Sequence, residues 1–265
     1  MSLVETSTLD SAAGIVELRL ARPPVNALNP ALCVELRNAI HSAVAGGARG
    51  IVLSSAYRPD APTVFSAGLD VPHLLSLGDD RDRLREAWES FFDVARALAG
   101  APVPVAVAMP GHAPAGGCVL ALCCDYRVMA TSPDPSRPLR IGLNETQVGL
   151  AVPPGVQHLL RRVVGAHRAE RLLVAGEMVD SEHALRIGLV DELAPIDVVV
   201  EHALKWLQGT LALPADAMLQ TRAIARADIV QALEPANIVL DRFLDAWYAP
   251  GTQQALHALV ARLRK

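Results

Sequence analysis

Aromatic side chains are scarce in this chain. Only 4% of its 265 residues are Phe, Trp or Tyr, whereas 51% are hydrophobic. The interior is therefore expected to be packed mainly with Ala, Val and Leu. The length suits one large domain, or a core with an appendage.

Long apolar runs and an excess of positive charge are also missing. No apolar run approaches the roughly 20 residues needed to cross a membrane. The net charge is −4, so there is no basic footprint for nucleic acid. Residues 1–11 are polar and carry Glu5 and Asp10, unlike a signal peptide. We expect a cytoplasmic protein with neither a membrane nor a nucleic acid as partner.

Cysteines are few, and their spacing is not that of a metal site. Three of the four lie in one apolar segment, but without a C-x-x-C pair or a following histidine pair: Cys33, Cys118, Cys123 and Cys124. Buried reduced cysteine behaves as a small hydrophobe, which fits a reducing cytosol. We therefore expect no metal.

Motifs for two other kinds of site are absent as well. Gly116-Gly117 lacks the residues that complete a P-loop or a dinucleotide fingerprint. The Gly-x-Ser-x-Gly turn of a serine hydrolase does not occur. His112 is expected to shape a turn, with a role beside the substrate as the alternative.

Apolar residues recur with the spacing of alternating strands and helices. Strands are predicted at 15–20, 51–54 and 103–109, and helices at 30–45 and 80–98. This alternation favours a layered α/β core with parallel strands. Three prolines in 131–139 predict a surface loop. Beyond about Pro195 the pattern is helical, with helices predicted at 198–208, 214–227, 235–249 and 252–264.

One carboxylate, Glu145, lies in a stretch of mostly apolar or uncharged residues, 141–150. A carboxylate in a poorly hydrated pocket has a raised pKa and can accept and return a proton near neutral pH. A surface acid or a helix N-cap is the ordinary alternative for a single glutamate. What favours a catalytic role is the pair of turns that precede it.

Both turns join a buried strand to a helix through small residues. The first follows strand 51–54 and a loop through Pro59 and Pro62, and reads TVFSAGLD at 63–70. The second follows strand 103–109 and ends in Gly116-Gly117. Small residues let a ligand approach the main chain, and the first turn of a helix has N–H groups without partners. Each turn alone is typical of ordinary proteins, but the pair indicates a site for developing negative charge.

These segments resemble the crotonase (enoyl-CoA hydratase/isomerase) superfamily. The resemblance runs in order from about Ile15 to Val200 and rests on five motifs: ARPPVNAL at 21–28, FSAGLD at 65–70, PAGGC at 114–118, CDYR at 124–127 and ALRIGLVD at 184–191. Within the superfamily, CDYR followed by IGLNETQ at 141–147 is similar to the Δ3,Δ2-enoyl-CoA isomerases of the mitochondrial dodecenoyl-CoA type. The resemblance implies an α/β fold with a layered spiral core of ββα repeats and a C-terminal helical region.

The resemblance also implies roles for particular residues. The backbone N–H groups of Ala67 and Gly116 would bind the thioester oxygen of an acyl-CoA. Coenzyme A would lie along two loops, as part of the substrate rather than as a cofactor: Val25, Asn26 and Ala27, and Ser66, Ala67, Gly68, Leu69 and Asp70. Arg22 is a candidate for a phosphate contact, with a solvated arginine at a strand end as the alternative.

Hydratases of this family use two glutamates. The first would fall on Val119, which can be neither acid nor base, and the second falls on Glu145. One carboxylate is enough to move a proton from carbon 2 to carbon 4. We therefore expect an enoyl-CoA isomerase of fatty acid β-oxidation. Other crotonase chemistry, such as hydration or thioester hydrolysis, and a non-catalytic acyl-CoA-binding subunit are the alternatives.

The resemblance to the superfamily implies that the chain has two parts. Residues 1–195 would form the core with the CoA and acyl site, and 196–265 a helical region that joins subunits. By the same resemblance, the assembly would be a homotrimer or a dimer of trimers.

Overall fold

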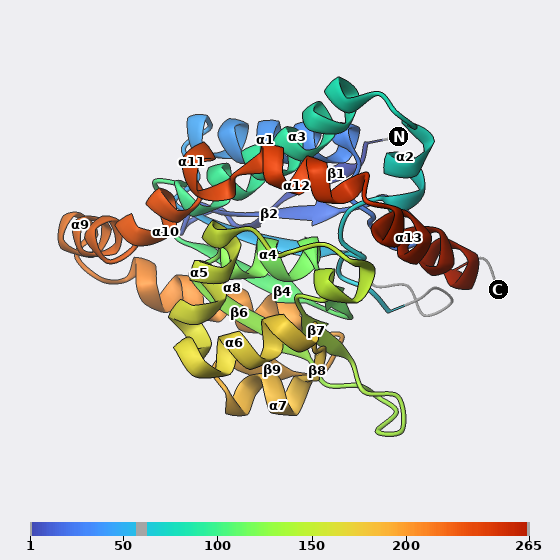
Figure 1. The fold of residues 1–265 in the computed structure, drawn as a ribbon. Helices are drawn as coiled ribbons and strands as arrows, with labels where there is room; N and C mark the ends of the chain where they lie inside the picture. The colour runs from blue at the N-terminus through green and yellow to red at the C-terminus, as the bar shows by residue number, and fades with distance from the viewer. Residues whose placement is uncertain (1, 57–62, 264–265) are drawn as a thin grey trace.

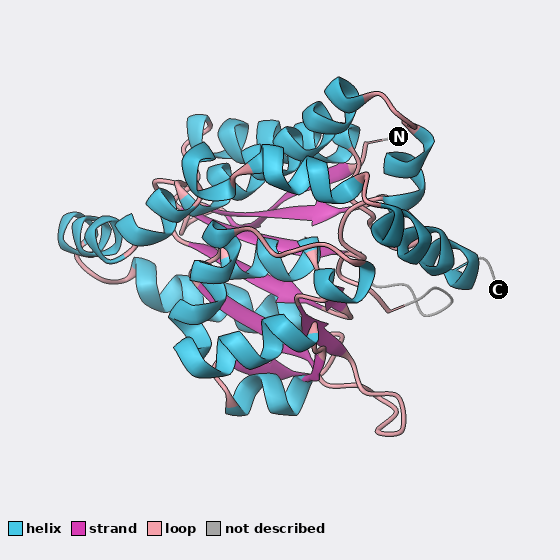
Figure 2. Ribbon diagram, viewed as in Figure 1, coloured by secondary structure: helices cyan, strands magenta, loops and turns pink. Residues whose placement is uncertain are grey.

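The computed structural model describes residues 2–56 and 63–263 (Figure 1). The predicted loop through Pro59 and Pro62 and the last residue of the predicted helix 252–264 lie outside the described residues. Strands occupy the interior and helices lie outside them (Figure 2). The predicted α/β class is confirmed.

A six-stranded sheet forms the main layer, in the order β1-β2-β3-β4-β6-β9. β1 runs antiparallel to β2, and every other neighbouring pair is parallel. β3 and β4 are buried along their whole length, which explains why neither strand contains a charged residue. The strands are β1 Val4–Asp10, β2 Ile15–Leu20, β3 Gly50–Ser55, β4 Val105–Met109, β6 Tyr126–Ala130 and β9 Glu192–Ala194.

A second sheet has three short strands, β5 (Ala113–Pro114), β7 (Arg140–Gly142) and β8 (Val179–Asp180). β5 and β7 are parallel, with Ala113 opposite Ile141 and Pro114 opposite Gly142. In two successive units a strand of the main sheet is followed by a short strand of this sheet and then by a helical turn. The chain thus repeats a ββα pattern, as the resemblance implied.

The helices before residue 190 include the predicted ones, with small differences at their ends. The helix 30–45 is found as predicted, with Asn29 as N-cap, and the helix 80–98 begins one residue later because Asp80 is its N-cap. The predicted strand 103–109 begins only at Val105. The helices are α1 Pro30–Ala45, α2 Val71–Ser76, α3 Arg81–Ala99, α4 Gly116–Leu122, α5 Pro154–Val164, α6 Ala166–Ala175 and α7 Ser181–Arg186, with a 3₁₀ turn η1 at Glu145–Val148.

The C-terminal part is helical, but two predicted helices are divided. The segment 235–249 breaks at Val239, whose φ of 52° is left-handed, and 214–227 breaks at Arg226. A left-handed valine is unfavourable and has no local sequence signal, so the periodicity could not show this break. The helices are α8 Val199–Leu211, α9 Ala215–Ala225, α10 Ala227–Ala232, α11 Pro235–Ile238, α12 Leu240–Trp247 and α13 Pro250–Leu263.

The C-terminal helices are packed on the rest of the chain. α8 lies against β4 and β6 of the main sheet, and α12 lies against α3. The contact between α3 and α12 is aromatic, with the rings of Trp88 and Phe243 centred 4.3 Å apart. The helical region therefore contributes to the same hydrophobic core as the first 195 residues.

Candidate active site

The two small-residue turns meet in space. A methyl group on Gly68 would come within 3.1 Å of the Gly116 nitrogen and 3.2 Å of the Ala115 Cβ. A methyl group on Gly116 would in turn come within 3.3 Å of the Gly68 Cα. Gly68 also has a φ of +79°, a conformation that glycine adopts at low cost. Small residues are thus required here because two backbones touch.

The backbone N–H of Ala67 is not free to bind an oxyanion, contrary to the sequence prediction. It donates to the carbonyl oxygen of Val25 at 2.9 Å. Leu69, two residues further on, has a backbone N–H without a hydrogen bond among the described residues. Leu28 bonds to the residues on either side of Leu69, which turns the Leu69 N–H to the opposite side. Leu69 therefore replaces Ala67 as the candidate donor in the first turn.

The second turn presents the N–H of Gly116 at the start of α4. This N–H has no partner within the helix, because only later residues of a helix reach back to a carbonyl. The N–H of the preceding residue, Ala115, donates to the carbonyl oxygen of Gly142 at 2.8 Å. That bond extends the pairing of β5 with β7 and ties the second turn to the segment that leads into Glu145.

Glu145 is the first residue of η1, three residues after the end of β7. The residue as a whole is half-buried, but its carboxyl oxygen Oε2 is shielded from solvent and has no hydrogen-bond partner among the described residues. Burial raises the pKa of Glu145 from 4.5 to about 7, although a hydrogen bond from its own backbone N–H acts in the opposite direction. Glu145 is thus a carboxyl group that can exchange a proton near neutral pH.

The helix α4 offers Glu145 no second acid. Val119 is only 2% exposed and carries no titratable group. The Cys118 thiol is near enough for the Glu145 charge to contribute to its raised pKa, of which burial is the larger cause. That thiol therefore stays neutral, and the other carboxylate of the described site, Asp70, is ion-paired with Arg22.

The two loops that were predicted to hold coenzyme A are bound to one another. The Asn26 side chain donates to the Phe65 carbonyl oxygen at 3.0 Å, and Ser66 Oγ donates to the Asn26 carbonyl oxygen at 2.8 Å. The structure therefore brings together the predicted residues 25–27 and 66–70. These joined loops form a rim that includes the Leu69 N–H.

Arg22 braces the same rim. Its guanidinium forms an ion pair with Asp70 at 2.6 Å and donates to the Ala27 carbonyl oxygen at 2.7 Å. Asp70 also accepts the N–H of His73 and so caps α2. Arg22 was expected either to contact a phosphate or to be solvated. In the structure its side chain instead joins the two loops to one another.

His112 supports the second turn from outside. Its Nδ1 accepts the backbone N–H of Arg140 at 3.0 Å, and its own backbone pairs with Thr63 and Phe65. Burial is the main cause of its lowered pKa, with Arg140 and Arg137 as further causes. A neutral imidazole whose unprotonated Nδ1 accepts a backbone hydrogen bond is consistent with the expected turn-shaping role.

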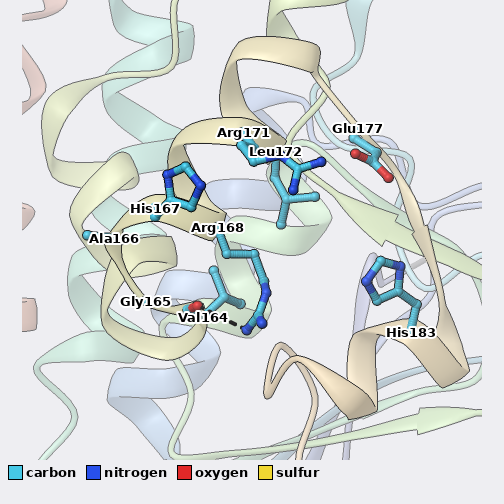
Figure 3. A pocket seen from close by; sticks show the side chains of 9 residues that line it. All are labelled: Val164, Gly165, Ala166, His167, Arg168, Arg171, Leu172, Glu177 and His183. Carbon is cyan, nitrogen blue, oxygen red and sulfur yellow. Dashed lines mark hydrogen bonds between the residues drawn. The ribbon is translucent and has the colours of Figure 1, made fainter.

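A surface pocket of about 470 Å³ lies elsewhere, between α5, α6 and α7 (Figure 3). It is lined by four basic side chains and one acidic one, with four other residues: His167, Arg168, Arg171, His183 and Glu177, with Val164, Gly165, Ala166 and Leu172. None of the residues described above as the candidate site lines it, so it is a separate feature.

The four cysteines are buried free thiols. Within residues 2–56 and 63–263 no group of three or more His, Cys, Asp or Glu side chains is arranged to hold a metal ion. No helix in the same ranges is both long and apolar enough to span a membrane.

Comparison with known proteins places the chain in a family. Residues 10–245 match the enoyl-CoA hydratase/isomerase family. The mitochondrial enoyl-CoA delta isomerase 1 of Mus musculus is 31% identical over 99% of this chain and 87% of its own length. A probable enoyl-CoA hydratase of Mycobacterium avium (strain 104) is 32% identical over 80% of this chain and 77% of its own.

The fold agrees with this placement. The crystal structure of human mitochondrial Δ3,Δ2-enoyl-CoA isomerase superposes with a TM-score of 0.88 at 30% identity, covering 99% of this chain and 98% of that one. The predicted crotonase fold is thereby confirmed. With its paired turns, the shielded and unpartnered carboxyl oxygen of Glu145 and these relatives, the chain belongs to the enoyl-CoA hydratase/isomerase family and is an enzyme of that family.

Proposed function

We propose that this enzyme is a Δ3,Δ2-enoyl-CoA isomerase acting on acyl-CoA thioesters in fatty acid metabolism. The observation that carries the proposal is the single carboxylate: Glu145 has a buried oxygen without a partner, while Val119 occupies the position where hydratases of the family carry their other glutamate. Moving a double bond requires one group that takes a proton and returns it, and no water.

The thioester oxygen is placed between the N–H groups of Leu69 and Gly116. Removing a proton from carbon 2 of a 3-enoyl-CoA produces a dienolate whose charge lies largely on that oxygen. Each well-placed donor of this kind lowers the barrier by about 2.7–4 kcal/mol. The contact of Gly68 with the Gly116 backbone supports this placement, because it holds the two turns together before substrate arrives.

Glu145 acts as both base and acid. In its ionised form it removes the proton from carbon 2, and in its protonated form it delivers the proton to carbon 4. A pKa of about 7 suits both steps, since neither protonation state is strongly favoured near neutral pH. The coenzyme A moiety lies along the joined loops 25–27 and 66–70.

Hydration is the second candidate, because a 32% identical relative is named a probable hydratase. It would require Glu145 alone to place water across the double bond. A pair of substrates separates the two reactions. 3-Hexenoyl-CoA forms a conjugated enoyl thioester when isomerised, and crotonyl-CoA loses its conjugation when hydrated.

The test follows enoyl thioester absorbance with both substrates. We expect absorbance to rise with 3-hexenoyl-CoA and to remain constant with crotonyl-CoA. Loss of absorbance with crotonyl-CoA would show that hydration occurs with one glutamate, and would overturn the proposal.

The variant Glu145→Gln keeps the shape of the side chain and removes the proton acceptor. We expect isomerisation to fall by about 10²–10⁴-fold, the usual contribution of a positioned acid or base, with acyl-CoA binding nearly unchanged by calorimetry. If Glu145→Gln retains most of the activity, another group is the base.

A further inference from the structure

The last helix, α13, packs against both halves of the candidate site. It contacts η1, which carries Glu145, and α2, which directly follows the turn that carries the Leu69 N–H (Figure 1). Three residues at intervals of four face inward and are buried: Thr252, Leu256 and Val260. The helix is therefore held firmly in the place where it bridges the base and the oxyanion turn.

Thr252 joins α13 to the C-cap of η1. It is 4% exposed, and its Oγ1 donates to the Gly149 carbonyl oxygen at 3.0 Å. A methyl group on Gly149 would come within 2.8 Å of that hydroxyl and 3.1 Å of the Thr252 Cα. Gly149 is the C-cap of η1, with a φ of +78°. Glycine is required there by both the contact and the backbone conformation.

The other side of η1 is held by α6. Thr146 Oγ1 donates to the Leu173 carbonyl oxygen at 3.2 Å, and Gln147 Nε2 donates to the Gly176 carbonyl oxygen at 2.7 Å. A turn of four residues has little rigidity of its own, and its position depends on these external contacts. η1 is thus clamped between the end of α6 and the start of α13.

We propose that Thr252, on α13, is a positioning residue that holds Glu145 in place by fixing the end of η1. The proposal rests on the proposed function for the role of Glu145. Thr252 acts through Gly149 and need not touch the substrate.

Loosening this contact has two consequences for Glu145. The carboxyl group moves relative to the two N–H donors, and a misplacement of about 1 Å can cost about 10²-fold in rate. Water also reaches the carboxyl group, which moves its pKa toward the ordinary value for glutamate. Cys118 on α4 is the titratable neighbour of Glu145, and its thiol stays neutral. No charged side chain contributes to the raised pKa of Glu145.

The experiment compares Thr252→Val, Thr252→Ala and Thr252→Ser with the wild type. The first two remove the hydroxyl and the third keeps it. We expect kcat for 3-hexenoyl-CoA to fall tenfold to a hundredfold, on the order of a 1 Å misplacement, in the valine and alanine variants. KM should change by no more than about twofold, because substrate binding does not use this contact. The serine variant should recover most of the rate.

A second readout does not depend on turnover. The infrared carboxyl C=O band that is absent in Glu145→Gln reports protonation of Glu145 in the free enzyme. Its midpoint should lie near pH 7 in the wild type and in Thr252→Ser, and lower in Thr252→Val and Thr252→Ala. The wild type could show the midpoint near pH 7, and the valine and alanine variants the lower one, without any isomerisation of 3-hexenoyl-CoA. That result would refute the proposed function but would leave the positioning role of Thr252 intact.

Thr210→Val is the matched control, since Thr210 lies on α8, in the same helical region but away from η1. It should change neither kcat nor the midpoint. The positioning role is refuted if Thr252→Val and Thr252→Ala keep the wild-type rate and midpoint, or if serine fails as completely as valine. Two hydroxyl-free variants are used so that either one, if folded, decides the result.

Discussion

At the scale of single residues, the burial of the Glu145 carboxyl group makes the stability of the folded protein depend on pH. Glu145 gains no compensating charge or hydrogen bond at Oε2 among the described residues, so its ionised form is disfavoured in the folded protein. Its folded pKa, raised to about 7, lies above the ordinary glutamate value. A raised pKa means that the stability contributed by the protonated form is present at low pH and is lost as pH rises through the folded value.

Glu145→Gln should therefore stabilise the protein relative to the wild type as pH rises from 4.5, where the unfolded glutamate ionises, to about 7, where the folded one does. We expect the Tm of the variant to equal that of the wild type near about pH 4, and to exceed it above about pH 7. Thermal unfolding across this range provides the measurement, with Glu170→Gln on the exposed side of α6 as control. An equal Tm difference at both ends of the range would mean that burial does not set this pKa.

The identity of the first oxyanion donor shows where reasoning from single residues reaches its limit. The motif at 65–70 places several successive N–H groups beside the site, and local sequence does not say which is free. Ala67 is excluded by the Val25 carbonyl oxygen, and Leu69 is oriented by its pairing with Leu28. Both partners come from the distant loop 25–28. The catalytic candidate Glu145, in contrast, could be predicted from its mostly apolar or uncharged neighbours together with the two turns that precede it.

At the scale of elements, the candidate site depends on how closely two turns approach. Gly117 follows the donor Gly116, and a methyl group on it would lie 2.6 Å from the Ser66 carbonyl oxygen. That distance is shorter than a van der Waals contact, and the two backbone segments are each held in place by other hydrogen bonds. Added bulk must move one turn away from the other.

Gly117→Ala should consequently lower both stability and kcat, because it separates the Leu69 and Gly116 donors. The loss of one donor costs about 10²–10³-fold in kcat. Gly209→Ala is the matched control, since Gly209 lies in α8 with no atom near its missing Cβ. It should raise stability by about 1 kcal/mol and leave kcat unchanged. Equal kcat in the two variants would show that the turns need not touch.

The elements differ in how well local pattern predicts them. α1 was predicted to its last residue, because an amphipathic stripe coincides with Pro30 at its start and the Asn29 cap. The small sheet of β5, β7 and β8 was not predicted, because strands of two or three residues show no periodicity. The break at Val239 was missed for a related reason: tertiary packing imposes a backbone conformation that valine does not favour.

At the scale of the whole molecule, α9 is the helix whose side chains lie most outside the packed core among the residues described above. α9 has no buried residue, and apolar side chains beside and on it are exposed, with Leu213 at 55% and Ile224 at 79%. It is anchored to the core by Arg222, which forms an ion pair with Asp125 at 2.8 Å.

The assembly predicted from the family resemblance can be tested by mass. We expect light scattering to give three or six times the mass of the 28.1 kDa chain. The charged variant Ile224→Glu should reduce the assembly, whereas Val174→Glu, at the other strongly exposed apolar position on α6, serves for comparison. A wild-type mass of 28.1 kDa would contradict the prediction.

The place of α13 in the chain has a consequence for how the enzyme is made. Every strand of both sheets precedes residue 195, whereas the helix that joins η1 to α2 begins at Pro250. During synthesis, this helix therefore leaves the ribosome after every strand of both sheets. A chain that ends early carries the whole sheet and the Glu145 carboxyl but lacks the Thr252 contact. Under the positioning role proposed for Thr252, chains truncated before Pro250 have little activity, and full activity requires that synthesis has passed Thr252.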